Sequence, residues 1–109
     1  MATTYKVLGQ VAPSATTNTD LYTVGAGKSA VVSTIAVTNR AGTSSTYRIA
    51  IRVAGSALSN EEYIAYDATI TANNTVMITI GITLGATDVI TVYGSTANLS
   101  FNAFGSEIS

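Results

Sequence analysis

The 109-residue chain contains no histidine, no cysteine and no tryptophan, and it has a single proline. Without histidine the commonest general base is missing, and without cysteine there is no thiol nucleophile, no disulfide and no sulfur ligand for zinc or iron–sulfur clusters. Charged residues make up 10% of the chain, which is less than half of the roughly 25% in an average soluble domain. These absences argue against an enzyme and against a metal or cofactor site.

The charged residues nearly balance, because five Lys/Arg and six Asp/Glu give a formal net charge of −1. Proteins that bind nucleic acid or an anionic membrane surface concentrate Lys and Arg, so we expect neither partner. The longest uncharged stretch, residues 68–87, is rich in Thr, Asn and Gly and is unlike a membrane span. The opening residues MATTYK lack the basic start and apolar run of a secretory signal, which predicts a protein made and folded in the cytoplasm.

Alternation of apolar and polar residues with a period of two dominates the sequence and predicts β-strands. No segment has the 3.6-residue apolar period of an amphipathic helix. Turns rich in Asn and Gly separate the alternating segments. The pattern predicts an all-β fold, a single antiparallel β-sandwich of jelly-roll or immunoglobulin-like type over residues 1–109. About eight strands are predicted, over residues 4–11, 20–24, 29–39, 45–54, 62–66, 75–84, 88–94 and 98–104.

Residues 25–29, GAGKS, are similar to the end of a phosphate-binding P-loop. That loop has a second glycine five positions before the last one and opens a helix. Here Tyr22 stands in the position of the first glycine, and the strand-like segment AVVSTI follows the lysine and serine. We therefore predict a turn between two strands and no nucleotide site.

A surface with so few charges favours an assembly interface, since the centres of interfaces are depleted in charge. Arg48 and Arg52 lie on one face of a predicted strand, where their guanidinium groups either pair with carboxylates of a neighbouring subunit or point into solvent. Tyr63 and Tyr66 are predicted to face opposite ways on a short strand, one toward the core and one at a rim or interface. A sugar-binding site would place Tyr63 beside Asn60 and Asp67.

Seven short segments together resemble a family of small virion structural proteins of tailed phages, which is best represented in phages of cyanobacteria. They are TYKVLGQ (4–10), LYTV (21–24), VSTI (32–35, with Asn39 and Arg40 after it), TYRIA (46–50), YIAYD (63–67), TDVITVY (87–93) and FGSEI (104–108). The resemblance implies a particle component without a catalytic motif, located in the virion. It implies most specifically a decoration (cement) protein on the head, which stabilises the capsid through its subunit interfaces.

From this resemblance we expect a homo-oligomer, a trimer for a decoration protein of this size, in contact with the major capsid protein or other virion proteins. The alternative is a tail, baseplate or fibre-associated module that acts as an adhesin and binds a glycan. Because the termini of particle proteins often lie across their neighbours, removal of residues 105–109 is predicted to weaken assembly and leave the fold intact. The expected interface residues are Tyr5, Arg48, Arg52, Phe101, Phe104 and Ile108.

Overall fold

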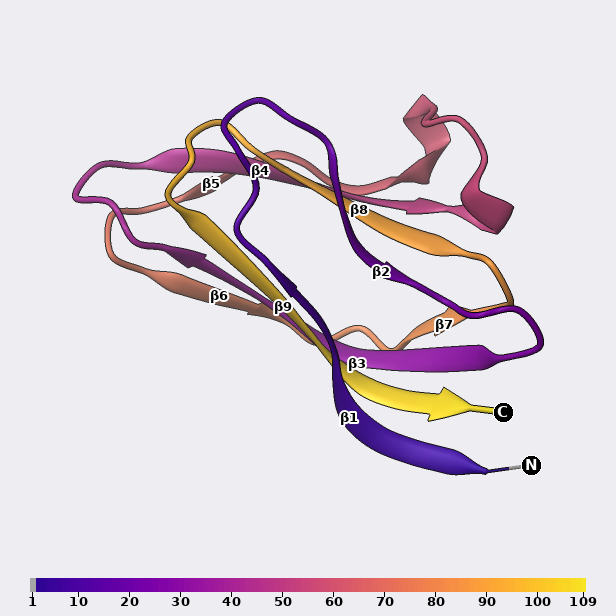
Figure 1. The fold of residues 1–109 in the computed structure, drawn as a ribbon. Coiled ribbons are helices and arrows are strands. Elements are labelled where there is room, and N and C mark those ends of the chain that lie inside the picture. Colours follow the sequence, from indigo (N-terminus) through magenta and orange to yellow (C-terminus); the bar gives the residue numbers. More distant parts are fainter. Residues whose placement is uncertain (1) are drawn as a thin grey trace.

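A computed structural model describes residues 2–109 of the chain (Figure 1). The described residues form nine strands and two short 3₁₀ helices. In chain order they are β1 (Thr3–Val11), β2 (Thr19–Thr23), β3 (Ser29–Asn39), β4 (Ser45–Arg52), η1 (Val53–Gly55), η2 (Asn60–Glu62), β5 (Tyr63–Ile70), β6 (Thr75–Ile78), β7 (Ile82–Leu84), β8 (Val89–Gly94) and β9 (Leu99–Ile108). No helix among them is long and apolar enough to cross a membrane.

The strands form two antiparallel sheets that pack face to face (Figure 1). Sheet A has the order β1-β9-β3-β6, with β7 also paired to β3, and sheet B has the order β2-β8-β4-β5. The chain crosses from one sheet to the other at every connection except those from β4 to β5 and from β6 to β7. This strand order is that of a jelly roll, so the predicted antiparallel β-sandwich is confirmed and its jelly-roll form is the correct one of the two.

Several strand predictions differ from the structure: the strand expected over residues 62–66, for example, is β5, which continues to Ile70. The strand expected over residues 75–84 is two strands, β6 and β7, and Gly81 in the segment between them has φ +62°. That conformation is incompatible with a continuous strand, and the sandwich therefore has nine strands instead of eight. The final strand continues to Ile108, four residues beyond its predicted end, because β9 lies between β1 and β3 and pairs with both.

The position of β9 overturns the expectation for the chain end. Deleting residues 105–109 would remove the part of β9 that pairs with Ser29–Val32 of β3 and with Thr3–Lys6 of β1. The backbone hydrogen bonds of both neighbours would lose their partners there. The deletion would therefore damage the fold as well as any interface.

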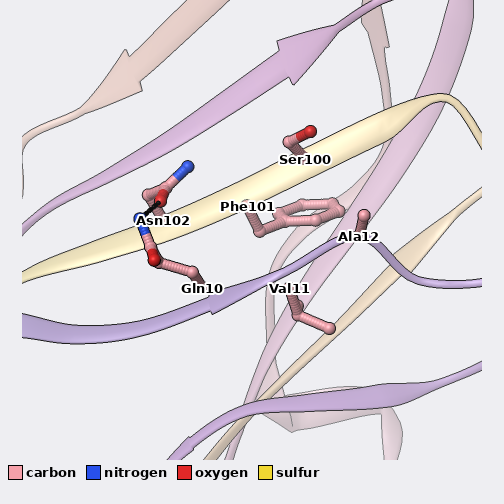
Figure 2. Close-up of a pocket in the computed structure, with 6 residues that line it drawn as sticks. All are labelled: Gln10, Val11, Ala12, Ser100, Phe101 and Asn102. Carbon is pink, nitrogen blue, oxygen red and sulfur yellow. Dashed lines mark hydrogen bonds between the residues drawn. The ribbon is translucent and has the colours of Figure 1, made fainter.

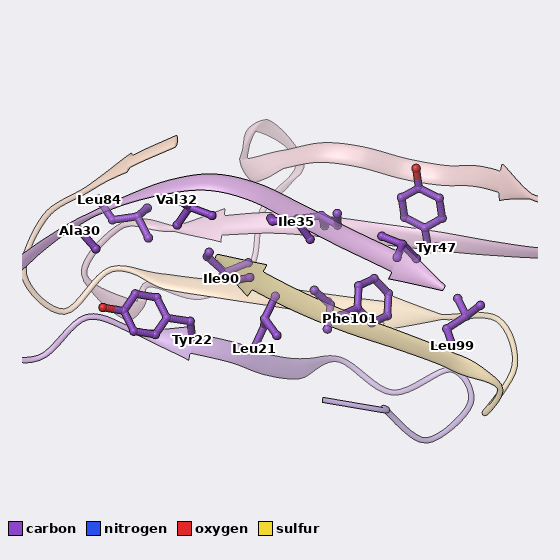
Figure 3. Close-up of a cluster of buried hydrophobic side chains, with 14 of the residues drawn as sticks. Leu21, Tyr22, Ala30, Val32, Ile35, Tyr47, Leu84, Ile90, Leu99 and Phe101 are labelled. Carbon is purple, nitrogen blue, oxygen red and sulfur yellow. The ribbon is translucent and has the colours of Figure 1, made fainter. Parts of the chain in front are cut away.

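The core lies between the sheets and is made of the inward-facing residues of both (Figure 3). Phe101 of β9 is fully buried there, and its ring meets the ring of Tyr47 of β4 edge to face, with the centroids 6.4 Å apart. The expected interface role of Phe101 is wrong, because its side chain is packed into the core and has no exposed surface for a partner to contact. The neighbouring residues Asn102 and Ser100 point outward instead, as strand alternation requires.

Asn39 at the end of β3 is a buried polar residue with no exposed surface. Its side-chain Nδ2 donates to the carbonyl oxygens of Thr43, Ile70 and Thr71 at 2.8, 3.3 and 3.2 Å, and its Oδ1 accepts the backbone N–H of Ala41 at 3.0 Å. Its backbone N–H donates to the carbonyl of Asn74. One side chain thus joins the β3–β4 loop to the end of β5.

The GAGKS segment forms a turn from β2 to β3, closed by the backbone N–H of Lys28 donating to the Gly25 carbonyl at 3.2 Å. The predicted turn between strands is confirmed. The two strands belong to different sheets, so this turn carries the chain across the sandwich.

Candidate functional site

The outer face of sheet A carries no charged side chain. Its residues follow from the register, because directly paired residues of antiparallel strands share a face and Phe101 and Ala103 mark the inward face. They are Thr3, Tyr5, Val7 and Gln10 of β1, Ser100, Asn102, Phe104, Ser106 and Ile108 of β9, Ser29, Val31, Thr34, Ala36 and Thr38 of β3, Thr75 and Met77 of β6, and Thr83 of β7. We call this surface the uncharged face.

The uncharged face exposes large apolar side chains between hydroxyl groups that bond to one another. Tyr5 is 82% exposed, Met77 64% and Val7 48%. Threonine hydroxyls pair across β3 and the segment that starts with β6, Thr38 with Thr75 at 3.1 Å and Thr34 with Thr79 at 3.3 Å. Hydroxyls that bond to each other compete less for water, so the face is less polar than its composition indicates.

Three of the expected interface residues, Tyr5, Phe104 and Ile108, lie together on the uncharged face, although they come from opposite ends of the chain. The pairing of β1 with β9 brings them together. Met77 and Val31 were missed, because they were assigned to no site. They could have been found from the outward-facing residues of the strands in sheet A, because none of these residues is charged.

A shallow pocket of ≈ 370 Å³ adjoins this face where β1 leaves the sheet (Figure 2). Gln10 and Asn102 meet across β1 and β9, and the Gln10 Nε2 donates to the Asn102 Oδ1 at 2.7 Å. The remaining lining is Val11, Ala12, Ser100 and Phe101. The pocket has no charged or nucleophilic group beyond one serine hydroxyl, and it gives the uncharged face a recess beside its flat centre.

The other expected interface residues lie on the outer face of sheet B. Arg48 forms a two-pronged ion pair within the chain, with its Nε 2.6 Å from Asp67 Oδ1 and its Nη2 3.3 Å from Oδ2. Its guanidinium also lies 4.3 Å from the ring centroids of both Tyr66 and Tyr93. This hydrogen bond lowers the pKa of Asp67 and raises that of Arg48. The carboxylate expected from a neighbouring subunit is thus supplied by the chain itself.

Arg52, on the same outer face, has its Nε buried without a hydrogen-bond partner among the described residues, and its Nη2 lies 3.5 Å from the Gly55 carbonyl oxygen.

Irregular pairing between β4 and β5 places two tyrosines on one face. Tyr66 and Asp67 both stand opposite Arg48, and Ile64 is an extra residue between the positions paired with Ile49 and Ala50. Each extra residue changes which face the following side chains take. Tyr63 and Tyr66 therefore lie side by side, with ring centroids 4.8 Å apart at 82°, and the prediction that they face opposite ways is wrong.

These two rings and Asn60 line a pocket with a cavity volume of ≈ 480 Å³. Asn60 belongs to η2, directly before Tyr63, so the short helix and the start of β5 build the pocket together. Of the three residues expected for a sugar site, the structure brings Asn60 and Tyr63 to the pocket. Tyr66 takes the place of Asp67, which is held by Arg48.

A cluster of hydrogen-bonded and charged side chains around Glu107 lies at the end of the sandwich near the termini. The Glu107 carboxylate accepts a hydrogen bond from the Tyr22 hydroxyl at 2.8 Å and pairs with Lys6 at 3.2 Å and Lys28 at 3.5 Å. The hydrogen bonds from Tyr22 and Lys6 lower the pKa of Glu107, whereas burial and Glu107 raise the pKa of Tyr22. All polar groups of this cluster are engaged with one another, and this favours a structural role.

The cluster predicts a pH dependence of stability. Because the folded-state pKa of Glu107 is lowered below its unfolded value of about 4.3, its contribution is present above that pH and is lost as the pH falls through the folded pKa. The unfolding temperature of Glu107→Gln should therefore lie below that of the native chain at neutral pH, and the difference should shrink as the pH falls and Glu107 takes up a proton. A difference that stays constant with pH would contradict this assignment.

In the part of the chain that the structure describes, no group of three or more Asp or Glu residues is arranged to hold a metal ion. The paired acidic residues Glu61 and Glu62 are both engaged locally: Ser59 Oγ donates to Glu61, and the Ser59 backbone N–H donates to Glu62.

No protein-family model and no curated protein sequence matches the chain. A solved structure, that of infectious bursal disease virus Gx strain, matches with a TM-score of 0.47 and 10% sequence identity over 97% of this chain. The chain spans about 30% of the length of the matched viral chain. The likeness is too distant to transfer a property from that virus to this protein.

Proposed function

We propose that the chain is a non-enzymatic structural protein of a virus particle and, more narrowly, a head decoration protein that binds the major capsid protein through its uncharged face. The observation that carries the proposal is the uncharged face itself, with Tyr5, Val7 and Met77 exposed on it. The resemblance of seven segments to virion structural proteins of tailed phages supports the same function.

The size of the uncharged face is suitable for this role. At the usual strand spacing and rise it covers on the order of 600 Å², near the roughly 800 Å² that each partner buries in a standard interface. Depletion of charge, with exposed large side chains such as Tyr5 and Met77, is the composition found at the centres of protein interfaces. With no charge to desolvate, contacts on this face also depend little on salt, an advantage for a particle that meets varied ionic conditions.

We assign the assembled capsid shell as the partner of the uncharged face, because binding to the assembled state stabilises it. A protein that binds only the assembled shell lowers the free energy of that state by mass action. A flat surface free of charge contributes area without needing matched ion pairs. The proposed homo-oligomer, a trimer, would then be held by other surfaces, and the protein would reside in the virion.

A charge on the uncharged face should remove the protein from particles. Met77→Glu would bury an unpaired carboxylate, which costs several kcal/mol, so we expect at least about a tenfold loss of copies per particle. The matched control is Val53→Glu, because Val53 is equally exposed at 65% but lies in η1, outside the uncharged face. Quantitative peptide mass spectrometry of purified virions measures both. Equal incorporation of the two variants would contradict the assignment of the face.

The copy number of the native chain separates head from tail. A ratio to the major capsid protein near one, or a simple fraction of it, supports a decoration protein. A ratio equal to that of tail or baseplate proteins favours the alternative of a tail, baseplate or fibre-associated adhesin. Absence from the particle would contradict a virion function altogether.

A further inference from the structure

The pocket between Asn60, Tyr63 and Tyr66 is on the side of the sandwich opposite the uncharged face, since it belongs to the outer face of sheet B. A protein held through sheet A would present this pocket to the surroundings. Its cavity volume of ≈ 480 Å³ falls within the range of about 300–1,000 Å³ typical of small-molecule sites.

The aromatic walls of the pocket are held in place before any ligand binds. Arg48 stacks on the Tyr66 ring and is itself anchored by Asp67, and Tyr63 meets Tyr66 edge to face. Tyr66 nevertheless remains 58% exposed. A ring that is fixed in this way loses little freedom when a ligand stacks on it, which lowers the entropic cost of binding.

The loop that supplies Asn60 is also fixed. Glu62 accepts the backbone N–H of Ser59 through Oε1 and the hydroxyl of Ser56 through Oε2, both at 2.9 Å. This capping box holds η2 against the start of β5. It also engages both oxygens of the Glu62 carboxylate within the loop.

The polar tips around the pocket are, in contrast, available. Among the described residues, no hydrogen bond involves the side-chain amide of Asn60 or the hydroxyl of Tyr63 or Tyr66. The lining therefore combines aromatic planes with hydroxyl and amide groups and carries no net charge, because Arg48 is neutralised by Asp67. None of the three lining residues therefore offers a charge to an anionic or cationic ligand.

We propose that this pocket binds a neutral saccharide. A sugar ring offers an apolar C–H face for the tyrosine planes and a rim of hydroxyls for the Asn60 amide and the phenol groups, which a purely apolar ligand would leave unpaired. Jelly rolls serve as lectin domains as well as capsid domains, so the fold is compatible with the site. The inference does not depend on the proposed place of the protein in a virion.

The test uses the full chain on an array of neutral and acidic glycans, followed by saturation-transfer NMR with the methyl glycoside of the best neutral sugar. Tyr66→Ala and Asn60→Ala should each weaken binding, the first by about tenfold or more, as removal of a stacking aromatic anchor does. Tyr5→Ala is the matched control, because it removes an exposed tyrosine from the opposite face and should bind normally.

If Tyr66→Ala does not fold, Tyr66→Phe and Asn60→Ala still test the polar contacts, and both should weaken binding. Binding of acidic glycans alone, silence of the whole array, or normal binding by Asn60→Ala and Tyr66→Phe would overturn the proposal. Failure here is distinguishable from failure of the proposed function, since Met77→Glu should bind the sugar normally and the Tyr66 variants should enter particles normally.

Discussion

Asn39→Asp should be the most destabilising single-atom change in this protein, with a loss of about 3–5 kcal/mol in the free energy of unfolding. The substitution replaces the Nδ2 amide, which donates to the Thr43, Ile70 and Thr71 carbonyls, by an oxygen that faces the same three acceptors. A carboxylate at this position would also place a negative charge in a fully buried site. Desolvation and repulsion therefore act in the same direction.

Urea or thermal unfolding followed by circular dichroism measures this effect. Asn18→Asp is the matched control, because it makes the same change at an exposed loop position and should leave stability within about 0.5 kcal/mol of the native value. Asn39→Ala should lose less than Asn39→Asp, since it leaves the carbonyls unpaired but introduces no charge.

Acidification provides a further check on Asn39→Asp. Burial among carbonyls raises the pKa of the introduced carboxyl above its unfolded value, so the penalty applies at neutral pH and shrinks as the pH falls and the group takes up a proton. The protonated form can donate one hydrogen bond to the carbonyls. An Asn39→Asp protein as stable as the native chain at pH 7 would show that Asn39 does not join these segments.

Gly105→Ala is expected to cost about 3 kcal/mol, at the upper end of the cost of overpacking. A Cβ on Gly105 would collide with the carbonyl oxygen of Val31 and would stand 3.0 Å from the Cα of Val32, both backbone atoms of β3. β9 cannot move away, because β1 pairs with its other edge. Gly105 pairs with Val32, directly beside the register shift between Val32 and Thr34 in β3.

The control for this prediction is Gly42→Ala. Gly42 lies in the β3–β4 loop, and a Cβ there would meet nothing within 4 Å. Its substitution should change stability by no more than about 0.5 kcal/mol, and a small gain is expected from reduced freedom of the unfolded chain. Equal unfolding midpoints for the two alanine variants would contradict the close approach of β9 to β3.

Sequence patterns located most of the strands, since period-two alternation reports which residues face the core. Residues 29–39 form β3 with the predicted limits, and Tyr47 and Ile49 are buried as their alternation predicts. Errors arose where alternation is interrupted. The extra residues of β5 reversed the predicted relation of Tyr63 and Tyr66, and a local pattern does not reveal such a bulge because it exists only relative to the partner strand.

For the candidate sites, too, the sequence did not predict which residues of other strands lie beside a given residue. Tyr5, Phe104 and Ile108 were chosen because the termini of particle proteins often lie across their neighbours, and the structure places all three on one face. Phe101 was chosen as part of the same C-terminal segment, but its side chain points to the opposite side of β9 and is buried. Arg48 was identified correctly as an outward residue of its strand. Its ion pair with Asp67, 19 positions away, was not predicted, because this contact depends on how β5 lies against β4.

The sequence by itself determined that the protein is an all-β antiparallel sandwich with few charges and without histidine or cysteine, because composition and alternation are properties of each strand alone. The tertiary structure alone decided the jelly-roll order, the gathering of the uncharged stripes of β1, β9, β3 and β6 on one face, and the pocket beside Tyr66. These features depend on which strands become neighbours and in what register. Hydrogen bonds and packing between residues far apart in the chain set that choice.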